Sequence, residues 1–269
     1  MRWKELLAVL PVLMAGTAAA AEYPCVMEPY KVVNVSTAVE GLLKEVKVDK
    51  GDLVKQGDVV ATLDSEVEAA LVEEARARVN LKATLEARQV RLNRARSRYE
   101  RGEDLSSKQF ISPDEMEEMA SEVEVAQREL QAEREKIALA RLELARVSAQ
   151  YDMRFIKSPI DGMVVQRFLS GGEFAQAQPI LTVAQLHPLH VEVVLPASVY
   201  GSVQQGMAAE VMPAEPVGGT HDARVKLVEQ VIDAASATFG VRLELPNPDY
   251  DLPAGLECRV RFLDEASAG

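Results

Sequence analysis

One segment of this chain occurs twice, and this repeat limits the possible folds more than any other feature. Residues 35–64 read VSTAVEGLLKEVKVDKGDLVKQGDVVATLD, and residues 156–185 read IKSPIDGMVVQRFLSGGEFAQAQPILTVAQ. The copies align without a gap at a constant offset of 121, which matches Gly41 with Gly162, Glu40 with Asp161, Gly51 with Gly172, Asp52 with Glu173 and Val59 with Ile180. Neither copy is long enough to bury a core alone, so we expect the two to pack on each other as halves of one domain.

The segment between the copies predicts two long helices joined at a tip. Residues 65–151 contain one Gly and one Pro, and both fall near the middle, at Gly102 and Pro113. Ser112, Pro113 and Glu115 are typical of a helix start, with a capping hydroxyl, Pro at the first position and Glu at the third. Each arm has about 37 residues and would extend roughly 55 Å at 1.5 Å per residue, so the hairpin is expected to project.

The second arm follows a coiled-coil repeat. Steps of three and four from Met116 reach apolar residues as far as Tyr151, with Glu133 as the one exception. An antiparallel register would place Arg88 of the first arm near Glu133, so we expect these two to pair. The first arm follows the same step less well, in the series Val67, Leu71, Glu74, Arg78, Leu81, Leu85, Arg88, Leu92, Ala95 and Tyr99.

The segments after the second copy predict a small antiparallel barrel. Turn residues separate five stretches with strand composition: HVEVVL, AAEVM, DARVKLVEQVI, FGVRLEL and LECRVRF. Residues 196–203 are expected to form one short helix. Residues 30–35, YKVVNV, have strand composition and no partner nearby, so they are expected to complete the barrel.

The first 21 residues are typical of a cleavable secretory signal. Arg2 and Lys4 precede an apolar run, and cleavage is expected after Ala20 or Ala21. The alternative is an uncleaved anchor, but the run from Leu6 to Met14 is short for a bilayer. No lipobox precedes Cys25. Cleavage would leave 28 basic and 41 acidic residues, a net charge of −13 against −12 for the whole chain. This balance argues against nucleic acid as a partner.

The chain has two cysteines, Cys25 and Cys258, near opposite ends of the exported part. In an oxidising compartment such a pair can form a disulfide, provided that the N-terminal strand returns to the C-terminal barrel. The alternative is two unpaired thiols, with Cys258 a buried strand residue. The sequence leaves both open.

Motifs in three places resemble the periplasmic adaptors, or membrane fusion proteins, of the HlyD-like family, and most closely those of RND-type efflux systems. The first half of the repeat carries the pattern in Val39, Gly41, Gly51, Asp52, Val54, Lys55, Gly57, Ala61, Leu63 and Asp64. The second half carries it in Ile156, Ser158, Pro159, Asp161, Gly162 and Val164. The end of the barrel carries it in Leu245, Pro246, Asn247, Pro248, Asp249, Leu252 and Gly255.

This resemblance implies an elongated multidomain α+β fold. A long antiparallel coiled-coil hairpin would be inserted between two halves of a lipoyl/biotinyl-like β-domain, with a small antiparallel β-barrel after it. Expected domains are a signal peptide (1–21), an N-terminal strand joining the barrel (22–34), lipoyl-like half 1 (35–64), the hairpin (65–153, tip 101–113), lipoyl-like half 2 (154–187) and the barrel (188–265). A further membrane-proximal domain is expected to be missing or rudimentary.

The resemblance also implies site residues. Adaptors that dock on TolC-type channels carry an Arg, a Leu four residues later and a Ser seven beyond it, matched here by Arg101, Leu105 and Ser112. Arg would supply a fork of donors and Leu an apolar anchor. The structural alternative is a turn-packing Leu105, a helix-capping Ser112 and a solvated Arg101. Tight turns of the lipoyl-like domain are assigned to Gly41, Gly51, Gly162 and Gly172.

The implied function is connective, without catalysis, cofactor or metal. A periplasmic adaptor of this kind would link an inner-membrane RND transporter to a TolC-type outer-membrane channel for export of small molecules, as six copies in the assembled pump. It would be associated with the inner membrane through the transporter. The alternative is an adaptor of an ABC-type exporter or a type I secretion system, although these usually keep an N-terminal membrane helix.

Three other kinds of chemistry find little support. A biotin or lipoate carrier needs a Lys at the turn joining the halves, which here is Asp64-Ser65. His187 and His190 flank a Pro, with no Cys or carboxylate cluster to complete a metal site. No Gly-x-Ser-x-Gly motif or nucleophile–base pair indicates a hydrolase.

Overall fold

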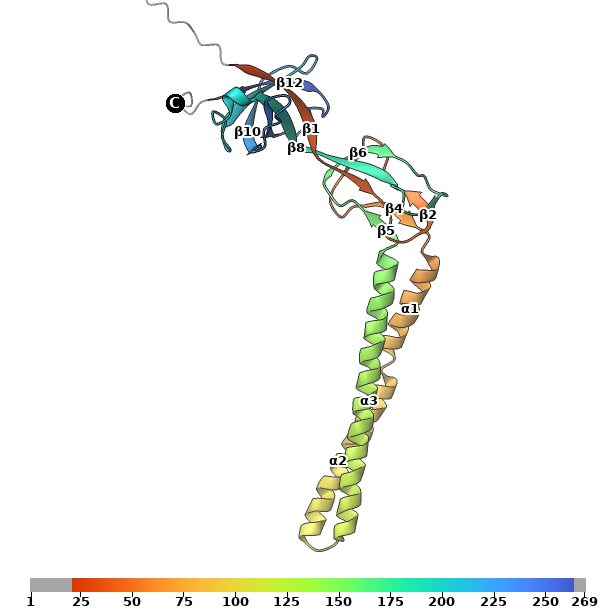
Figure 1. Ribbon diagram of the computed structural model, residues 1–269. Helices are drawn as coiled ribbons and strands as arrows, with labels where there is room; N and C mark the ends of the chain where they lie inside the picture. The colour runs from red at the N-terminus through yellow and green to blue at the C-terminus, as the bar shows by residue number, and fades with distance from the viewer. Residues whose placement is uncertain (1–20, 264–269) are drawn as a thin grey trace, which may run out of the picture. The chain divides into compact units, whose positions relative to one another are not determined.

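A computed structural model describes residues 21–263, so the predicted signal lies outside the described residues apart from Ala21. The chain forms two compact units. One comprises residues up to Val32 and from Ala184 onward, and the other comprises Val33–Val183. The elements, coloured along the chain in Figure 1, are β1 (Glu22–Val35), β2 (Gly41–Val46), β3 (Leu53–Val54), β4 (Val59–Leu63), α1 (Glu66–Asn80), α2 (Ala83–Ser107), α3 (Pro113–Asp152), β5 (Phe155–Lys157), β6 (Gly162–Arg167), β7 (Phe174–Ala175), β8 (Leu181–Pro196), η1 (Ala197–Val199), β9 (Ala208–Pro213), β10 (His221–Val228), β11 (Thr238–Leu245) and β12 (Glu257–Phe262).

The two repeat copies exchange strands rather than folding separately. In one pairing β3 of the first copy lies antiparallel to β6 of the second, with Leu53 opposite Met163. In the other, β7 of the second copy lies antiparallel to β2 of the first, with Phe174 opposite Leu42. Each residue of the second pair is offset by 121 from its counterpart in the first. The halves are therefore related by an internal pseudo-symmetry.

Backbone hydrogen bonds follow the same symmetry. The amide of Gly51 donates to the carbonyl of Val164 at 2.8 Å, and the amide of Gly172 donates to the carbonyl of Leu43 at 2.7 Å. Leu43 and Val164 are themselves equivalent by the offset, and both are fully buried. Because the turn of each half bonds to a strand of the other, neither half is complete alone. The shared core consists of Val35, Leu43, Val54, Val60, Ala61, Leu63, Ile156, Ile160, Val164, Ala175, Ile180, Leu181 and Val183.

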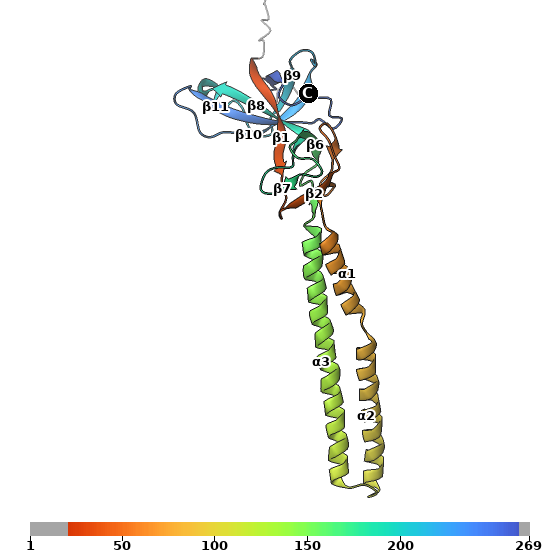
Figure 2. The ribbon, with the colours of Figure 1, turned by 90° about the vertical axis from the view of Figure 1, so that its right-hand side faces the viewer.

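The helices α1 and α2 lie against α3, which runs unbroken over 40 residues (Figure 2). Every α3 position in the predicted seam between Met116 and Tyr151 is buried or half-buried, Glu133 included. Three of them, Ala126, Leu130 and Val147, are buried in small clusters against the other arm. The stability of α3 thus comes from one stripe of seam positions that is apolar except at Glu133.

The first arm differs from the sequence prediction because it is two helices, not one. α1 ends at Asn80, and Leu81 has the non-helical angles φ −72° and ψ 79°. α1 buries Val72 and Ala75, whereas the predicted positions Val67, Leu71, Glu74 and Arg78 are exposed. In α2 the predicted positions Leu85, Arg88, Leu92, Ala95 and Tyr99 are buried or half-buried. The seam therefore steps by one residue at the break.

The predicted pairing of Arg88 with Glu133 is wrong. Arg88 bonds to Glu129 at 2.9 Å, and Arg91 reaches the same carboxylate at 2.7 Å. Glu133 instead has Lys136 of its own helix 3.5 Å away. The tip sets the register between α2 and α3, and at that register Arg91 pairs with Glu129 and Arg98 pairs with Glu122. Arg88, one turn before Arg91, reaches the same Glu129 carboxylate.

The barrel unit is built on the strand order β1-β12-β9-β10-β11-β8, and an additional pairing of β1 with β8 closes the sheet. Alternating residues of these strands fill its interior, as expected for a small barrel. Its buried core includes Met27, Leu189, Val191, Val193, Leu195, Val211, Val225, Val241, Leu243, Leu245 and Val260.

The N-terminal strand β1 begins at Glu22, the start of the expected segment 22–34 and earlier than YKVVNV alone. Its residues Glu22–Val26 pair with β12. At the other end of β1, Val33 and Val35 pack in the lipoyl-like core. The segment YKVVNV is therefore divided between the two units after Val32. The helix predicted for residues 196–203 is limited to the three-residue η1. Within the described range, no helix has the length and apolarity needed to cross a membrane.

Candidate functional site

The tip between α2 and α3 is a tight five-residue connection, Lys108–Ser112. The amide of Phe110 donates to the carbonyl of Leu105 at 3.0 Å, and the amide of Gln109 donates to Ser106 at 2.9 Å. Gln109 has a positive φ of 59°, the left-handed conformation that reverses the chain at a helix end. These bonds fix the tip, so its side chains are presented by a defined backbone.

Gly102 brings the two arms together next to the tip. It is buried, and a Cβ atom there would lie 2.7 Å from the Sδ of Met119 and 3.1 Å from that of Met116. A glycine inside a helix costs free energy relative to alanine. The close approach of α3 explains why this position has no side chain.

The three predicted docking residues lie on the elements that border the tip. Arg101 is exposed, and it forms no ion pair with any residue in 21–263. Leu105 is 43% exposed, a large fraction for a leucine next to a helix end. Both belong to the last turns of α2, so each is available to a partner.

Ser112 has a structural role at the start of α3. Its Oγ accepts a hydrogen bond from the Glu115 amide at 3.2 Å, and Glu115 Oε2 accepts one from the Ser112 amide at 2.9 Å. This reciprocal capping box is the arrangement that the sequence predicts. Ser112 is also exposed, so capping leaves its outer surface free for a contact.

Sequence reasoning overlooked Phe110, which is 74% exposed. An aromatic ring left in water at a fixed turn is a typical anchor for a protein partner. The signal was present in the sequence as one aromatic residue directly after the stretch EDLSSKQ, which is polar except for Leu105. We therefore add Phe110 to the candidate docking surface of Arg101, Leu105 and Ser112.

The four glycines assigned to tight turns fall into two classes. Gly51 and Gly172 have φ of +97° and +90°, which a residue with a side chain adopts only with strain. Gly41 and Gly162 instead begin strands β2 and β6 and do not have a positive φ. The turn assignment was wrong for this second pair, because the repeat places them at strand starts opposite β7 and β3.

Gly41 is needed for a close contact at the base of the hairpin. A Cβ atom there would lie 2.8 Å from Nη1 of Arg154. That nitrogen donates to the carbonyl of Glu40 at 3.2 Å, and Nη2 of Arg154 forms an ion pair with Glu68 of α1. Arg154 thus joins the lipoyl-like domain to both arms of the hairpin.

The LPNPD segment of the barrel is explained by Asn247, which is buried with its amide group fully bonded. Nδ2 donates to the carbonyls of Leu186 and Leu252 at 3.0 and 2.9 Å, and Oδ1 accepts from the amide of Leu252 at 3.1 Å. The amide of Asn247 donates to Nδ1 of His187 at 3.0 Å. This histidine is therefore a hydrogen-bond partner in a structural turn.

His190 lies beside the ring of Tyr30, with centroids 4.5 Å apart. Burial lowers its pKa below the usual range, and the positive charge of Arg242 acts in the same direction. Glu192, Glu244 and Glu28 oppose this shift. In the part of the chain that the structure describes, no three His, Cys, Asp or Glu side chains are grouped as a metal site would require.

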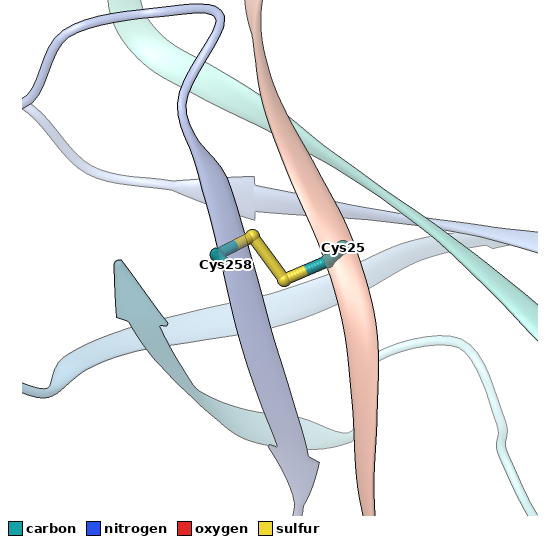
Figure 3. The surroundings of a disulfide bond; sticks show 2 residues. All are labelled: Cys25 and Cys258. Atoms are coloured by element: carbon teal, nitrogen blue, oxygen red, sulfur yellow. A yellow bond between two sulfur atoms is a disulfide. The ribbon is translucent and has the colours of Figure 1, made fainter. Parts of the chain in front are cut away.

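The two cysteines face each other across β1 and β12 (Figure 3). Cys25 and Cys258 are directly paired in the antiparallel register, with Cα atoms 4.8 Å apart, and a disulfide joins them. The bond links the first and last strands of the barrel unit.

Comparisons with known proteins identify the architecture. Residues 31–185 match the model of the CzcB-like, barrel-sandwich hybrid domain, and residues 188–266 match that of the CusB-like, beta-barrel domain. The macrolide export protein MacA of Yersinia pestis is 26% identical over 87% of this chain and 65% of its own length. The multidrug efflux pump subunit AcrA of Escherichia coli K12 is 22% identical over 90% of this chain and 61% of its own length.

This chain thus spans less than two thirds of the length of these curated relatives. A crystal structure of MacA from Actinobacillus actinomycetemcomitans has the same fold, with a TM-score of 0.72 at 21% identity over 90% of this chain and 78% of that one. The two domain models together cover most of the sequence, in the order that the structure displays. The chain belongs to the membrane fusion protein family of efflux-pump adaptors.

Proposed function

We propose that this protein is a non-catalytic periplasmic adaptor that links an inner-membrane efflux transporter to a TolC-type outer-membrane channel. The observation that carries the proposal is the hairpin tip, where a fixed backbone exposes Arg101, Leu105 and Phe110. An apolar pair beside an Arg fork is the composition of a protein-binding anchor.

The tip proposal is tested by matched substitutions on the same hairpin. Leu105→Asp places a charge in the apolar contact, and we expect it to reduce capture of the outer-membrane channel at least tenfold in a pull-down. Arg101→Glu should act in the same direction by reversing the charge. The control is Leu139→Asp on α3, where the leucine is 66% exposed but distant in sequence from the tip.

Equal channel capture by Leu105→Asp and Leu139→Asp would contradict the assignment. Helical circular dichroism of both variants checks that the hairpin is intact. Both leucines are exposed, so neither change should unfold it.

For the inner-membrane partner we propose an RND-type transporter. The support is the combination of motifs, in particular the LPNPD segment built around Asn247 and the predicted cleavable signal. The alternative is an ABC-type exporter, since the relatives include both a multidrug efflux pump subunit and a macrolide export protein. Cross-linking through the barrel followed by mass spectrometry distinguishes the two, because an ABC partner would be captured with an ATP-hydrolysing domain.

We further propose that the protein is exported by its signal, acts in the periplasm and works as six copies in the assembled pump. Export is tested by the mass of the protein in a periplasmic fraction, which should begin at Ala21 or Glu22. A product that retains Met1 in the membrane fraction would support the uncleaved anchor instead.

A further inference from the structure

The barrel sheet opens between β10 and β11 at one end. The pairing of β10 with β11 starts at Arg224 opposite Glu244, whereas β10 already pairs with β9 from His221 onward. On the other strand, β11 ends at Leu245, and the next residue is Pro246, which has no amide hydrogen to extend the ladder. The first three residues of β10 are therefore bonded to a neighbouring strand on one side only.

A cavity of about 520 Å³ lies at this opening. Its volume is within the range of roughly 300–1,000 Å³ that is typical of small-molecule sites. The hollow is lined by three alanines, of which Ala209 and Ala223 are buried and directly opposite each other across β9 and β10. The next buried positions of the same strands are Val211 and Val225. A side chain smaller than valine leaves the interior unfilled at this point.

Two opposite charges border the cavity without a partner in the protein. Asp222 and Arg224 both line it and are exposed, and within residues 21–263 neither forms an ion pair or a side-chain hydrogen bond. Glu244, opposite Arg224 in the register, is instead 3.1 Å from Lys226. Because Asp222 and Arg224 are two residues apart on one strand, their side chains leave the same face of β10, with Cα atoms about 7 Å apart.

His187 adds a hydrogen-bond donor to the lining of the cavity. Its Nδ1 accepts the amide of Asn247 at 3.0 Å, so the proton of the neutral ring lies on Nε2. In the part of the chain that the structure describes, Nε2 has no hydrogen-bond partner of its own. The prolines Pro188 and Pro246 supply further apolar surface. The cavity thus combines an apolar lining with one anionic acceptor and two donors.

We propose that this cavity binds a small molecule with an apolar body and a zwitterionic head group of the amino-acid type. The ammonium group bonds to Asp222 and the carboxylate to Arg224, with His187 as a second donor. Charge-assisted hydrogen bonds of about 2.8 Å let one such head group bridge two side chains that do not pair with each other. The site goes beyond the connective function proposed above, since it lies in the barrel unit and uses no residue of the hairpin tip.

Binding of Nε-dansyl-lysine to the purified full chain tests the site. This probe has a free amino-acid head group, and its fluorescence rises and shifts to the blue in an apolar environment. We expect saturable binding. Asp222→Asn and Arg224→Gln should each weaken the affinity by about tenfold or more, the effect of one lost charge-assisted hydrogen bond. The matched controls are Asp251→Asn and Arg259→Gln, exposed residues of the same unit outside the cavity, which should bind the probe as the wild type does.

Two analogues of the probe assign the charges. Dansyl-cadaverine has the amine but no carboxylate, so its weaker binding should respond to Asp222→Asn and not to Arg224→Gln. Dansyl-aminohexanoate has the carboxylate but no amine, and it should show the reverse pattern. Either analogue responding equally to both substitutions would contradict the proposed orientation of the head group.

A filled cavity provides the last control. Ala208 is half-buried and lines the cavity, so Ala208→Leu reduces its volume without altering its charges and should abolish binding. Thermal unfolding of each variant checks that the barrel is intact. Absence of saturable binding to the wild-type chain, or equal affinity of the wild type and Asp222→Asn for dansyl-lysine, would overturn the proposal.

Discussion

Arg154 is the side chain that holds the base of the hairpin, and Gly41 leaves the space that it occupies. We expect Gly41→Ala to destabilise the lipoyl-like unit by about 1–2 kcal/mol, because the new methyl group displaces a guanidinium that bonds to Glu40 and Glu68. Urea denaturation followed by circular dichroism measures this change.

A double-mutant cycle identifies the cause. In an Arg154→Ala background the guanidinium is gone, so Gly41→Ala should cost only a few tenths of a kcal/mol. A cost that stays the same in both backgrounds would mean that backbone conformation, not Arg154, requires the glycine.

We expect His190 to make the stability of the barrel unit depend on pH. Burial holds its folded-state pKa below the unfolded value of about 6.5, so the unfolded chain binds more protons in this range. The contribution of the neutral imidazole is fully present above the unfolded pKa and is lost as the pH falls through it. We expect the urea midpoint to fall between pH 7.5 and 5.5, and to fall less in His190→Gln. An identical decrease in both proteins would assign the effect to other groups.

The break at Leu81 separates what the sequence could predict from what it could not. The stepping pattern correctly identified the α3 seam, because its series from Met116 to Tyr151 is apolar at every position except Glu133. The same stepping pattern failed in α1. Leu81 and Leu85 are spaced as the pattern requires, but the residues that α1 buries are Val72 and Ala75. A one-residue shift in the seam positions of a helix can be recognised only when the partner helix determines which face is buried.

A single inserted residue should remove this break. With one Ala between Leu81 and Lys82, the seam of α1 would continue into α2 in one heptad phase, because the observed α2 positions lie one residue early. We expect the first arm to become continuous, with more helix by circular dichroism and slower amide exchange near the insertion. The matched control is one Ala inserted after Ala138 of α3, which rotates half of that seam by about 100° and should lower the melting temperature by several degrees. Equal losses from both insertions would contradict the phase argument.

The paired contacts of the lipoyl-like domain could be predicted from the sequence, because the offset of the repeat makes each contact in one half imply an equivalent contact in the other. The equivalence of Gly51 with Gly172 appears as two matching hydrogen bonds to Val164 and Leu43. The role of Gly41 could not be predicted from the offset, since its spatial neighbour Arg154 lies outside both copies of the repeat. The exposure of Phe110 likewise depends on the tip conformation, which no periodicity describes.

Across the molecule, both ends of the described chain return to the barrel unit, with β1 beside β12. The strands β1 and β8 also continue into the lipoyl-like unit, so the chain is linked to that unit by two extended segments. Fixing β1 at its barrel end therefore matters for both units. The disulfide between Cys25 and Cys258 performs this role, since it ties the first strand to the last.

Loss of that disulfide should weaken the barrel. We expect the variant Cys25→Ala/Cys258→Ala to lose about 2–5 kcal/mol of unfolding free energy, because the bond closes a loop with a sequence separation of 233 residues. Urea denaturation with and without a reducing agent measures the change. Reduction should lower the midpoint of the wild-type protein toward that of the variant and leave the variant unaffected. A wild-type midpoint insensitive to reduction, with the thiols shown to be free by labelling, would mean that strand pairing alone holds β1 in the barrel.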